Sequence, residues 1–403
     1  MMISGLNKEY LQDLNFFLEY ADSPRGKEND EQYPQESFHL DFYLNHSKEE
    51  LYDYINQFLT HNNVNNDYDF YYLMKCIIKY MSSFSDSHTM VYKNDNTWFP
   101  IRFKVVNNNV YIDRCFDKKM LRKIINNING IDINVIINEI ANCTSYGTNG
   151  WLLSNIEGKL CSKNDLLSLP CMNSKDGKIV FELENDEKIS FDINEKYELE
   201  TIYPKKEIEQ YNVIDDMLVF KYPSCKENYR PDINKIEEII EESSIKKFLL
   251  DLRGNSGGNS SIIEPLIEYL SNKDLELFTL VDRGVFSSGR FAAIEMKRIG
   301  SKIVGEEIGT PINCFGYVSG KGITPNSNIH FNFARVYWYE DNGFMKGIYT
   351  KEELKKRDKE FFKPKYLIPD IPIEINEEEY INSLEDVFFN KCIESIKTNS
   401  LKK

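Results

Sequence analysis

Residues 248–258 read Phe-Leu-Leu-Asp-Leu-Arg-Gly-Asn-Ser-Gly-Gly, and this stretch decides how the last third of the chain folds. Its apolar start predicts a buried strand, and its glycines predict a tight turn because glycine tolerates positive φ. The apolar spacing over residues 260–270 predicts a helix directly afterwards. Backbone N–H groups exposed at such a strand-turn-helix junction can hold an oxyanion, which acyl-transfer chemistry requires.

A second strand-to-helix junction carries Val285-Phe286-Ser287-Ser288-Gly289. A serine here lies beside the free N–H groups of a helix start, which favour negative charge. Ser287 is therefore the candidate nucleophile, and the backbone N–H groups of Gly257 and Ser288 are the candidate oxyanion donors. The alternative is structural, with either serine only capping the helix and the glycine-rich turn serving as an ordinary connection.

The chain has five histidines, and His88 stands in the stretch Asp86-Ser87-His88-Thr89. A serine hydroxyl needs a base at neutral pH, and an imidazole suits this role because its unperturbed pKa is about 6.5. The neighbouring polar side chains offer groups that orient the ring. Only the fold can bring His88 to Ser287, because the two residues lie far apart in the sequence.

Three regions follow from hydrophobic periodicity. Residues 1–92 predict a helical region, with helices near 11–18, 51–59 and 72–81 and a polar loop over 23–37. Residues 93–205 predict a β-rich segment with strands near 99–105, 110–112, 178–183 and 189–193, and a turn at 128–132 that leads into a short helix.

Residues 206–403 alternate strand and helix patterns, which predicts an α/β layer with the strands in the middle. The expected strands lie near 217–220, 248–250, 277–281 and 303–304, and the expected helices near 233–240, 260–270 and 288–299.

Composition excludes several functions. The formal net charge is -15, so phosphate backbones would meet a repulsive field and we expect no nucleic-acid partner. We find no apolar run approaching the ~20 residues of a membrane span, and the first twenty residues lack the pattern of a secretory leader. Eight scattered cysteines form no CxxC pair, which favours reduced thiols and offers no metal-ligand spacing. We therefore expect a cytoplasmic protein.

Three motifs in this order resemble the C-terminal-processing (tail-specific) serine peptidases and the related tricorn-core and retinoid-binding-protein-like members of that superfamily. They are the stretches 86–89, 251–258 and 286–289. Ile128-Asn129-Gly130 resembles the Ile-Asn-Gly turn of their PDZ-like module, and Ile368-Pro369-Asp370-Ile371 resembles the segment that closes their catalytic core. The resemblance covers roughly residues 70–375. It implies a crotonase-like α/β core with a PDZ-like insert, peptide-bond hydrolysis at or near substrate C-termini, and no metal or organic cofactor.

The chain departs from the processing branch in two places. That branch uses a serine-lysine dyad, but residues 304–316 contain no lysine and the next one is Lys321. The glutamate that usually follows the nucleophile by three residues is Arg290 here. The tricorn-like branch pairs serine with histidine instead, and Ser87-His88 matches it, with Ser87 orienting the base. This branch also implies a distant glutamate, for which Glu306, Glu307 and Glu360 remain candidates.

The sequence thus favours a serine peptidase acting on a peptide or protein substrate, with Ser287 as nucleophile and His88 as base. Gly258 and Arg290 are the expected substrate-binding residues. The leading alternative is a binding or scaffold protein that keeps the fold without catalysis, favoured by the missing lysine and by Arg290. A crotonase-like acyl-CoA enzyme is a third possibility, although it would leave Ser287 without a purpose. The sequence does not predict the oligomeric state.

Overall fold

A computed structural model describes residues 3–22, 46–82, 86–94, 97–172, 177–198, 202 and 209–400. Its second half forms a six-stranded sheet, and all the strand pairs of this sheet are parallel except β8–β9. The sheet order is β16 (Ile371–Pro372), β12 (Lys302–Gly305), β11 (Glu276–Val281), β10 (Lys247–Asp251), β9 (Met217–Lys221) and β8 (Tyr211–Ile214).

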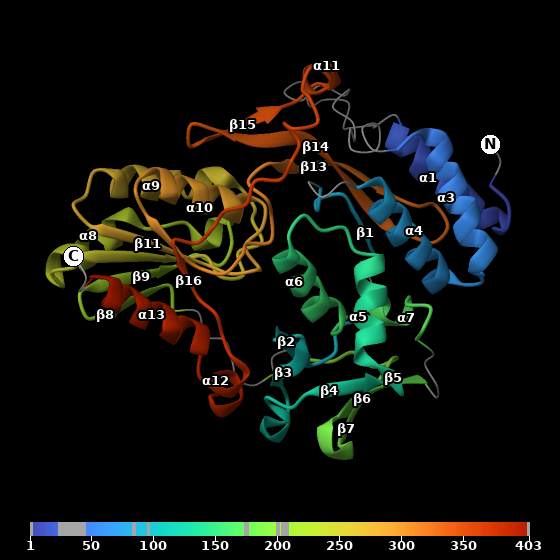
Figure 1. The fold of residues 1–403 in the computed structure, drawn as a ribbon, viewed down its shortest axis with the longest axis horizontal. Coiled ribbons are helices and arrows are strands. Elements are labelled where there is room, and N and C mark those ends of the chain that lie inside the picture. The colour runs from blue at the N-terminus through green and yellow to red at the C-terminus, as the bar shows by residue number, and fades with distance from the viewer. Residues whose placement is uncertain are drawn as a thin grey trace.

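Helices cover both faces of this sheet (Figure 1). One face packs against α8 (Ile233–Glu242), α9 (Glu264–Ser271) and α10 (Ser288–Arg298), and the other against α13 (Val387–Ser400). The predicted α/β layer is confirmed, because buried strands alternate with amphipathic helices as the periodicity indicated. The helix expected over 260–270 is split: a 3₁₀ turn at Ser260–Ile262 precedes α9, which has a proline in its first turn.

The three predicted N-terminal helices are also confirmed. They are α1 (Lys8–Asp22), α3 (Lys48–His61) and α4 (Asp67–Met81), and their apolar faces form one core. Phe17 of α1 packs edge-on against Phe331 with ring centroids 5.2 Å apart, so this helical region rests on a strand from the last third of the chain. The polar stretch 23–37 lies outside the described residues.

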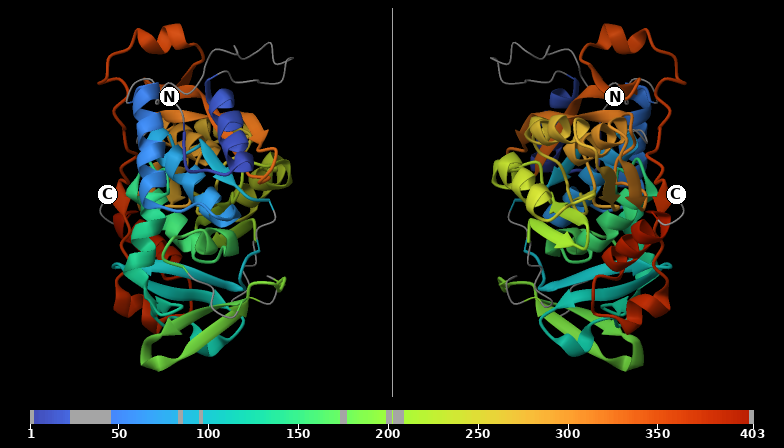
Figure 2. Two further views of the ribbon diagram at one scale, coloured as in Figure 1. Left: turned by 90° about the vertical axis from the view of Figure 1, so that its right-hand side faces the viewer. Right: turned by 90° about the vertical axis from the view of Figure 1, so that its left-hand side faces the viewer.

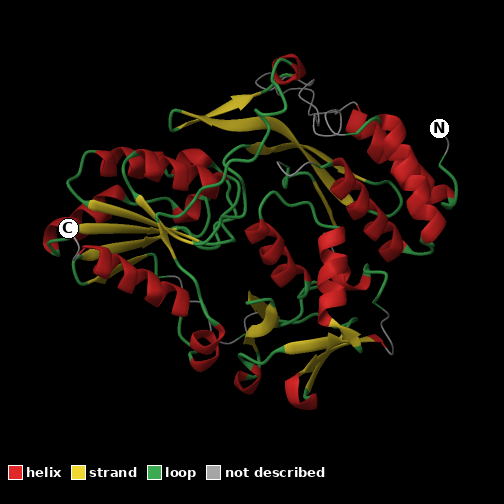
Figure 3. Cartoon of the chain, viewed as in Figure 1, coloured by secondary structure: helices red, strands yellow, loops and turns green. Residues whose placement is uncertain are grey.

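A second sheet was not predicted from the sequence. It consists of β1 (Met90–Tyr92), β14 (His330–Asp341), β13 (Cys314–Ile323) and β15 (Phe344–Ile348), with β14 pairing with the other three strands. In the β1–β14 ladder Met90 lies opposite Asn332. This long-range antiparallel pairing places the segment that contains His88 beside the last third of the chain (Figure 3, strands to the right of centre).

The β-rich segment forms a separate lobe, at one end of the molecule in both views of Figure 2. It contains the hairpin β2 (Ile101–Val106) and β3 (Asn109–Cys115), and a sheet in the order β5 (Ile131–Asp132), β4 (Ile125–Ile128), β6 (Lys178–Leu183), β7 (Lys188–Asp192). Asn129 and Gly130 adopt positive φ in the predicted β4–β5 turn, which leads into α5 (Ile133–Asn142). Helices α6 (Asn149–Lys159) and α7 (Lys163–Leu167) were not anticipated.

The remaining helices are short: α11 (Lys351–Lys355), α12 (Glu377–Asn382) and the 3₁₀ turns Lys118–Met120, Glu184–Asp186 and Glu227–Tyr229. Within the described ranges, no helix combines the length and hydrophobicity of a membrane span. No group of three or more His, Cys, Asp or Glu side chains in those ranges could hold a metal ion.

Candidate active site

The glycine-rich turn follows β10 and is anchored by a buried carboxylate. Asp251 is 2 % exposed and forms ion pairs with Arg253 (2.7 Å) and Lys221 (3.6 Å). Burial alone would raise the pKa of Asp251, but the charge and hydrogen bonds of Arg253, with help from Lys221, hold it below the ordinary value. The start of the turn is therefore held rigidly where the chain leaves the sheet.

Asn255 connects the turn to its neighbours, a role the sequence analysis missed. The side chain is fully buried, and its Nδ2 donates to the Tyr222 carbonyl at 2.8 Å. Its Oδ1 accepts the Gly257 N–H at 2.9 Å, and its own carbonyl accepts the Phe286 N–H at 2.9 Å. This one residue thus fixes the glycine-rich turn against the junction that carries Ser287.

Ser287 has strained backbone geometry at the start of α10. Its φ of 51° and ψ of -120° place a non-glycine residue in a region of positive φ. Its side chain makes no capping bond, and among the described residues its hydroxyl has no hydrogen-bond partner. The Ser288 hydroxyl instead donates to the Gly258 carbonyl at 2.7 Å. The alternative in which one of these serines caps the helix is wrong.

Gly257 lies against this junction. A Cβ atom at Gly257 would sit 2.7 Å from Ser287 Cβ and 2.8 Å from Ser288 N, and its φ is 103°. Ser288 is the first residue of α10, so its N–H is one of those that a helix leaves without an intrahelical acceptor. The N–H of Gly257, by contrast, already donates to Asn255.

His88 lies beside the residue that precedes Ser287. Its ring and that of Phe286 have centroids 4.4 Å apart, although the two residues lie almost two hundred positions apart in the sequence. The Asp86 carboxylate accepts the backbone N–H of His88 at 2.9 Å, and Asn332 Nδ2 donates to the His88 carbonyl at 3.1 Å. The backbone is therefore fixed on both sides. Among the described residues neither ring nitrogen has a hydrogen-bond partner, so His88 is not hydrogen-bonded to Ser287 here.

The imidazole of His88 is only 5 % exposed. Burial lowers its pKa to about 4; the Asp86 charge opposes this shift and the Arg290 charge adds to it. The nearby Phe315 backbone slightly favours the charged form, without reaching hydrogen-bond geometry at either ring nitrogen. His88 is therefore neutral at pH 7, which is the form a general base requires.

The three glutamates considered as orienting groups are engaged elsewhere. Glu306 forms an ion pair with Arg283 at 2.9 Å, and Glu307 Oε2 accepts the Gly150 N–H at 2.8 Å. Glu360 is 73 % exposed and pairs with Lys363. Ser87, expected to orient the ring, is buried with its hydroxyl unpartnered. None of these three glutamates is hydrogen-bonded to Ser87.

Lys321 lies away from the histidine. A Cβ atom at Gly316 of β13 would sit 3.7 Å from His88 Cε1. Lys321 is five residues further along the same strand, which corresponds to about 16 Å at the rise of a β-strand. Its side chain is exposed. The structure therefore brings His88, and not Lys321, to the Phe286–Ser287 junction.

The two residues expected to bind substrate contact the protein itself. Arg290 is 1 % exposed, and its Nη1 donates to the Pro311 and Ile312 carbonyls at 3.1 and 2.8 Å and to Cys314 Sγ at 2.6 Å. A Cβ atom at Gly258 would meet the Cys225 carbonyl at 2.3 Å, so Gly258 allows a close backbone approach.

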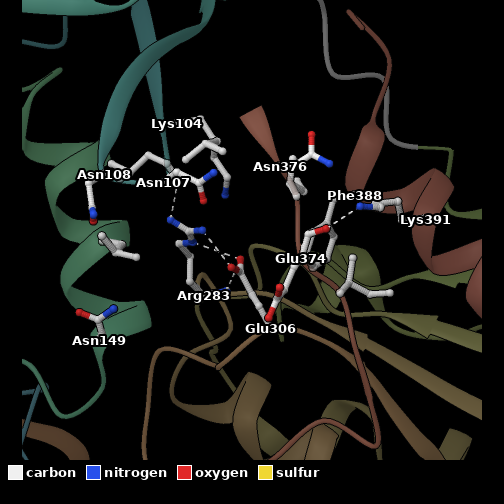
Figure 4. A pocket seen from close by; sticks show the side chains of 15 residues that line it. Lys104, Asn107, Asn108, Asn149, Arg283, Glu306, Glu374, Asn376, Phe388 and Lys391 are labelled. Atoms are coloured by element: carbon white, nitrogen blue, oxygen red, sulfur yellow. Dashed lines mark hydrogen bonds and ion pairs between the residues drawn. The ribbon is translucent and has the colours of Figure 1, made fainter. Parts of the chain in front are cut away.

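Two cavities flank the junction. A cavity of about 600 Å³ lies between the β2–β3 turn, α6 and the C-terminal segment (Figure 4). In it Arg283 points at Glu306 and bridges to the Val105 carbonyl at 3.2 Å. A second cavity of about 480 Å³ lies between α4, β1 and α6 and is lined by Ser87 and Trp151. Trp151 stacks on Phe286 with ring centroids 4.0 Å apart, so this second cavity adjoins the candidate site.

Structural comparison identifies the fold. Mature CPAF superimposes with a TM-score of 0.63 at 11 % identity, covering 97 % of this chain and 96 % of CPAF. Mature CPAF complexed with lactacystin gives the same score and identity, covering 98 % of both chains. The photosystem II D1 C-terminal processing protease matches with a TM-score of 0.43 at 11 % identity, covering 95 % of this chain and 99 % of that one.

No protein-family model and no curated protein sequence matches the chain. The structural likeness extends over nearly the whole chain, so the chain shares its overall fold with mature CPAF. The α/β class of the fold that the three sequence motifs implied is confirmed. Identity of 11 % shows the fold alone and transfers no residue roles.

Proposed function

We propose that this protein is a serine peptidase. Ser287 attacks the carbonyl carbon of the scissile peptide bond, while His88 accepts the hydroxyl proton and returns it to the leaving amine. Water then attacks the acyl-enzyme ester, with the same imidazole acting as base, and the free serine is regenerated. The Ser288 N–H stabilises the oxyanion, with Gly257 N–H as the second donor once it leaves Asn255.

The observation that carries this proposal is the conformation of Ser287. A serine with a strained backbone and an uncommitted hydroxyl, at the N-terminus of a helix, is what a nucleophile requires and what a structural cap does not. The neutral imidazole beside Phe286 supports it. Closing the gap between His88 and Ser287 requires a shift on substrate binding, since catalytic hydrogen bonds often tighten only in the complex.

A fluorophosphonate probe tests the proposal. We expect the wild-type chain to be labelled, Ser287→Ala to lose the label, and Ser288→Ala to keep it, because alanine retains the backbone N–H donor. His88→Ala should slow labelling by about 10²–10⁴-fold, the usual contribution of a general base. An unlabelled wild type, or a label on another serine, would remove the proposed nucleophile.

A second candidate is a binding or scaffold protein that keeps the fold without catalysis. Two observations favour it: the His88 ring nitrogens have no hydrogen-bond partner, and the Gly257 N–H is occupied by Asn255. Failure of labelling together with retained peptide binding would support this candidate.

Action near substrate C-termini is a further part of the proposal. It rests on the β-rich lobe, in which the Asn129-Gly130 turn joins β4 and β5 of a sheet that could bind a peptide as an added strand. Replacing residues 93–205 by a linker should abolish any preference for substrates that carry a C-terminal recognition tail. Unchanged cleavage of those substrates would separate this lobe from specificity.

A further inference from the structure

Among the described residues that line it, the second cavity has more lysines than acidic residues. Its lining includes Lys75, Lys93 and Lys159 but one acidic residue, Asp165, which is a formal excess of two positive charges. The chain as a whole has a formal net charge of -15. A positive cavity inside an acidic protein concentrates anions and repels cations locally.

The single carboxylate is already paired. Asp165 Oδ1 lies 3.3 Å from Lys75 Nζ, which also donates to Ser168 Oγ at 2.8 Å. Lys93 is 3.9 Å from Asp67, a residue outside the cavity lining. These two lysines therefore have acidic partners.

Lys159 has none among the described residues. Its Nζ donates to the neutral hydroxyl of Thr144 at 2.6 Å and forms no ion pair. Burial lowers the pKa of Lys159; the charge of Asp165 opposes this shift more strongly than the charge of Lys75 adds to it. Keeping an unpaired cation in a partly desolvated place costs stability, and such a cost is commonly retained for a ligand.

The cavity adjoins the candidate catalytic residues. Ser87, the residue before His88, lines it, and so does Trp151. Trp151 stacks on Phe286, and the same Phe286 ring contacts His88. One bound peptide could therefore place its scissile bond at Ser287 and another of its groups at Lys159.

We infer that this cavity binds a carboxylate of the peptide substrate, with Lys159 as its ion-pair partner. This inference rests on the proposed peptidase function for the ligand's class, although the cavity's charge does not depend on it. The carboxylate is supplied either by an acidic side chain or by the peptide C-terminus.

Binding to the full chain with Ser287→Ala tests the inference without cleavage. The probe is a fluorescein-labelled octapeptide mixture of Ala, Gly, Ser, Leu and Phe in three forms: C-terminal amide, C-terminal carboxylate, and amide with one Glu. We expect at least one carboxylate-bearing form to bind more than tenfold tighter than the neutral form by fluorescence anisotropy. The tighter form identifies the source of the carboxylate.

The variants decide the role of Lys159. Lys159→Met and Lys159→Gln should remove the preference for carboxylate, and Gln keeps a polar partner for Thr144 if Met perturbs folding. Lys159→Arg should preserve the preference, and Lys226→Met at an exposed site should not change it. Equal binding of all three peptide forms, no binding of any, or a preference that survives both neutral variants would overturn the inference.

The experiments test the peptidase proposal and the carboxylate site at Lys159 independently of each other. Fluorophosphonate labelling of the wild type reports on Ser287 and does not involve Lys159. A chain that is not labelled but shows Lys159-dependent binding would retain the carboxylate site and lose the peptidase. A labelled chain without carboxylate preference would retain the peptidase and lose this site.

Discussion

At the scale of single residues, His88 makes the protein sensitive to acid. Its pKa is about 4 in the folded chain against about 6.5 when unfolded, so the unfolded state binds the proton first as pH falls. Stability is unaffected above pH 6.5 and is lost progressively down to pH 4, by about 3 kcal/mol in total. We expect His88→Gln to lose less stability than wild type between pH 7 and pH 4.5 in urea unfolding. If the free energy of unfolding of the two proteins changes with pH in parallel, the His88 imidazole is not buried in its neutral form.

Gly257 gives a second prediction for a single residue, because no side chain fits at this position. A methyl group there would lie 2.8 Å from Ser288 N, where an oxyanion must bind, and 2.7 Å from Ser287 Cβ. We expect Gly257→Ala to reduce kcat/KM by at least 10²-fold, comparable with losing an oxyanion donor. The strained φ adds about 1–3 kcal/mol of destabilisation.

The Gly257 measurement pairs labelling rate with thermal unfolding. Gly254→Ala is the matched control, because its φ is also positive at 71° but nothing lies within 4 Å of its added Cβ. A Gly257→Ala chain that is labelled as fast as the control would show that no oxyanion forms beside this residue.

The residue scale also marks where sequence reasoning stops. Ser287 and His88 were found because serine and histidine carry recognisable chemistry. Asn255 was not, because its role depends on three backbone partners from separate segments, and no local pattern predicts those contacts. The free Ser287 hydroxyl could not be predicted either, since a serine at a helix start usually caps it.

At the scale of elements, Arg290 joins α10 to the segment before β13. Its Nη1 binds two backbone carbonyls, Pro311 and Ile312, inside the protein. We expect Arg290→Met to destabilise the chain by about 2–4 kcal/mol, because both carbonyls then lose a buried donor. Removing the Arg290 charge should also raise the pKa of His88, since that charge contributes to its lowering.

Kinetics distinguish this structural role from the substrate binding expected for Arg290. A structural residue predicts a lower unfolding temperature and a shifted pH dependence of labelling, with KM for a peptide little changed. A large increase in KM with unchanged stability would instead restore Arg290 as a substrate-binding residue. Arg298→Met is the control, because Arg298 lies on the same helix and pairs with Glu295 near the surface.

The elements themselves were predictable where their pattern is local. The helices of residues 1–92 and the alternating strands and helices of the last third follow from periodicity. The sheet of β1, β13, β14 and β15 does not, because β1 is three residues long and its partner lies more than two hundred positions away. Short strands paired over long distances leave little local signal, and this pairing positions His88.

At the scale of the whole molecule, Arg283 ties the β-rich lobe to the core. It pairs with Glu306 after β12 at 2.9 Å and with Glu157 of α6 at 3.2 Å, and it donates to the Val105 carbonyl of β2. Figure 4 shows this guanidinium between the two parts. Arg283 precedes the Ser287 junction in the same loop, so these contacts join the lobe to the segment that carries the candidate nucleophile.

Removing the positive charge of Arg283 should change how the free energy of unfolding depends on pH. Burial would raise the pKa of Glu306, but the charges of Lys104 and Arg283 hold it below its ordinary value. Ionised Glu306 therefore stabilises the fold at pH values above the ordinary pKa of a glutamate, and this contribution is lost in acid. In Arg283→Met the partly buried carboxylates of Glu306 and Glu157 lose this partner and both pKa values rise, so stability is lost as pH rises; burial already raises the pKa of Glu157 in the wild type. We expect a loss of about 3–5 kcal/mol at pH 8 and a smaller one at pH 5, measured by urea unfolding.

The control for this experiment is Lys273→Met. Lys273 pairs with Glu237 at 2.9 Å, but Glu237 is 43 % exposed, so removing its partner should cost less than 1 kcal/mol at either pH. Limited proteolysis should cut Arg283→Met between the lobe and the core faster than it cuts the control. If Arg283→Met is destabilised equally at pH 5 and pH 8, the two carboxylates are solvated, and the lobe is held to the core by its apolar contacts instead.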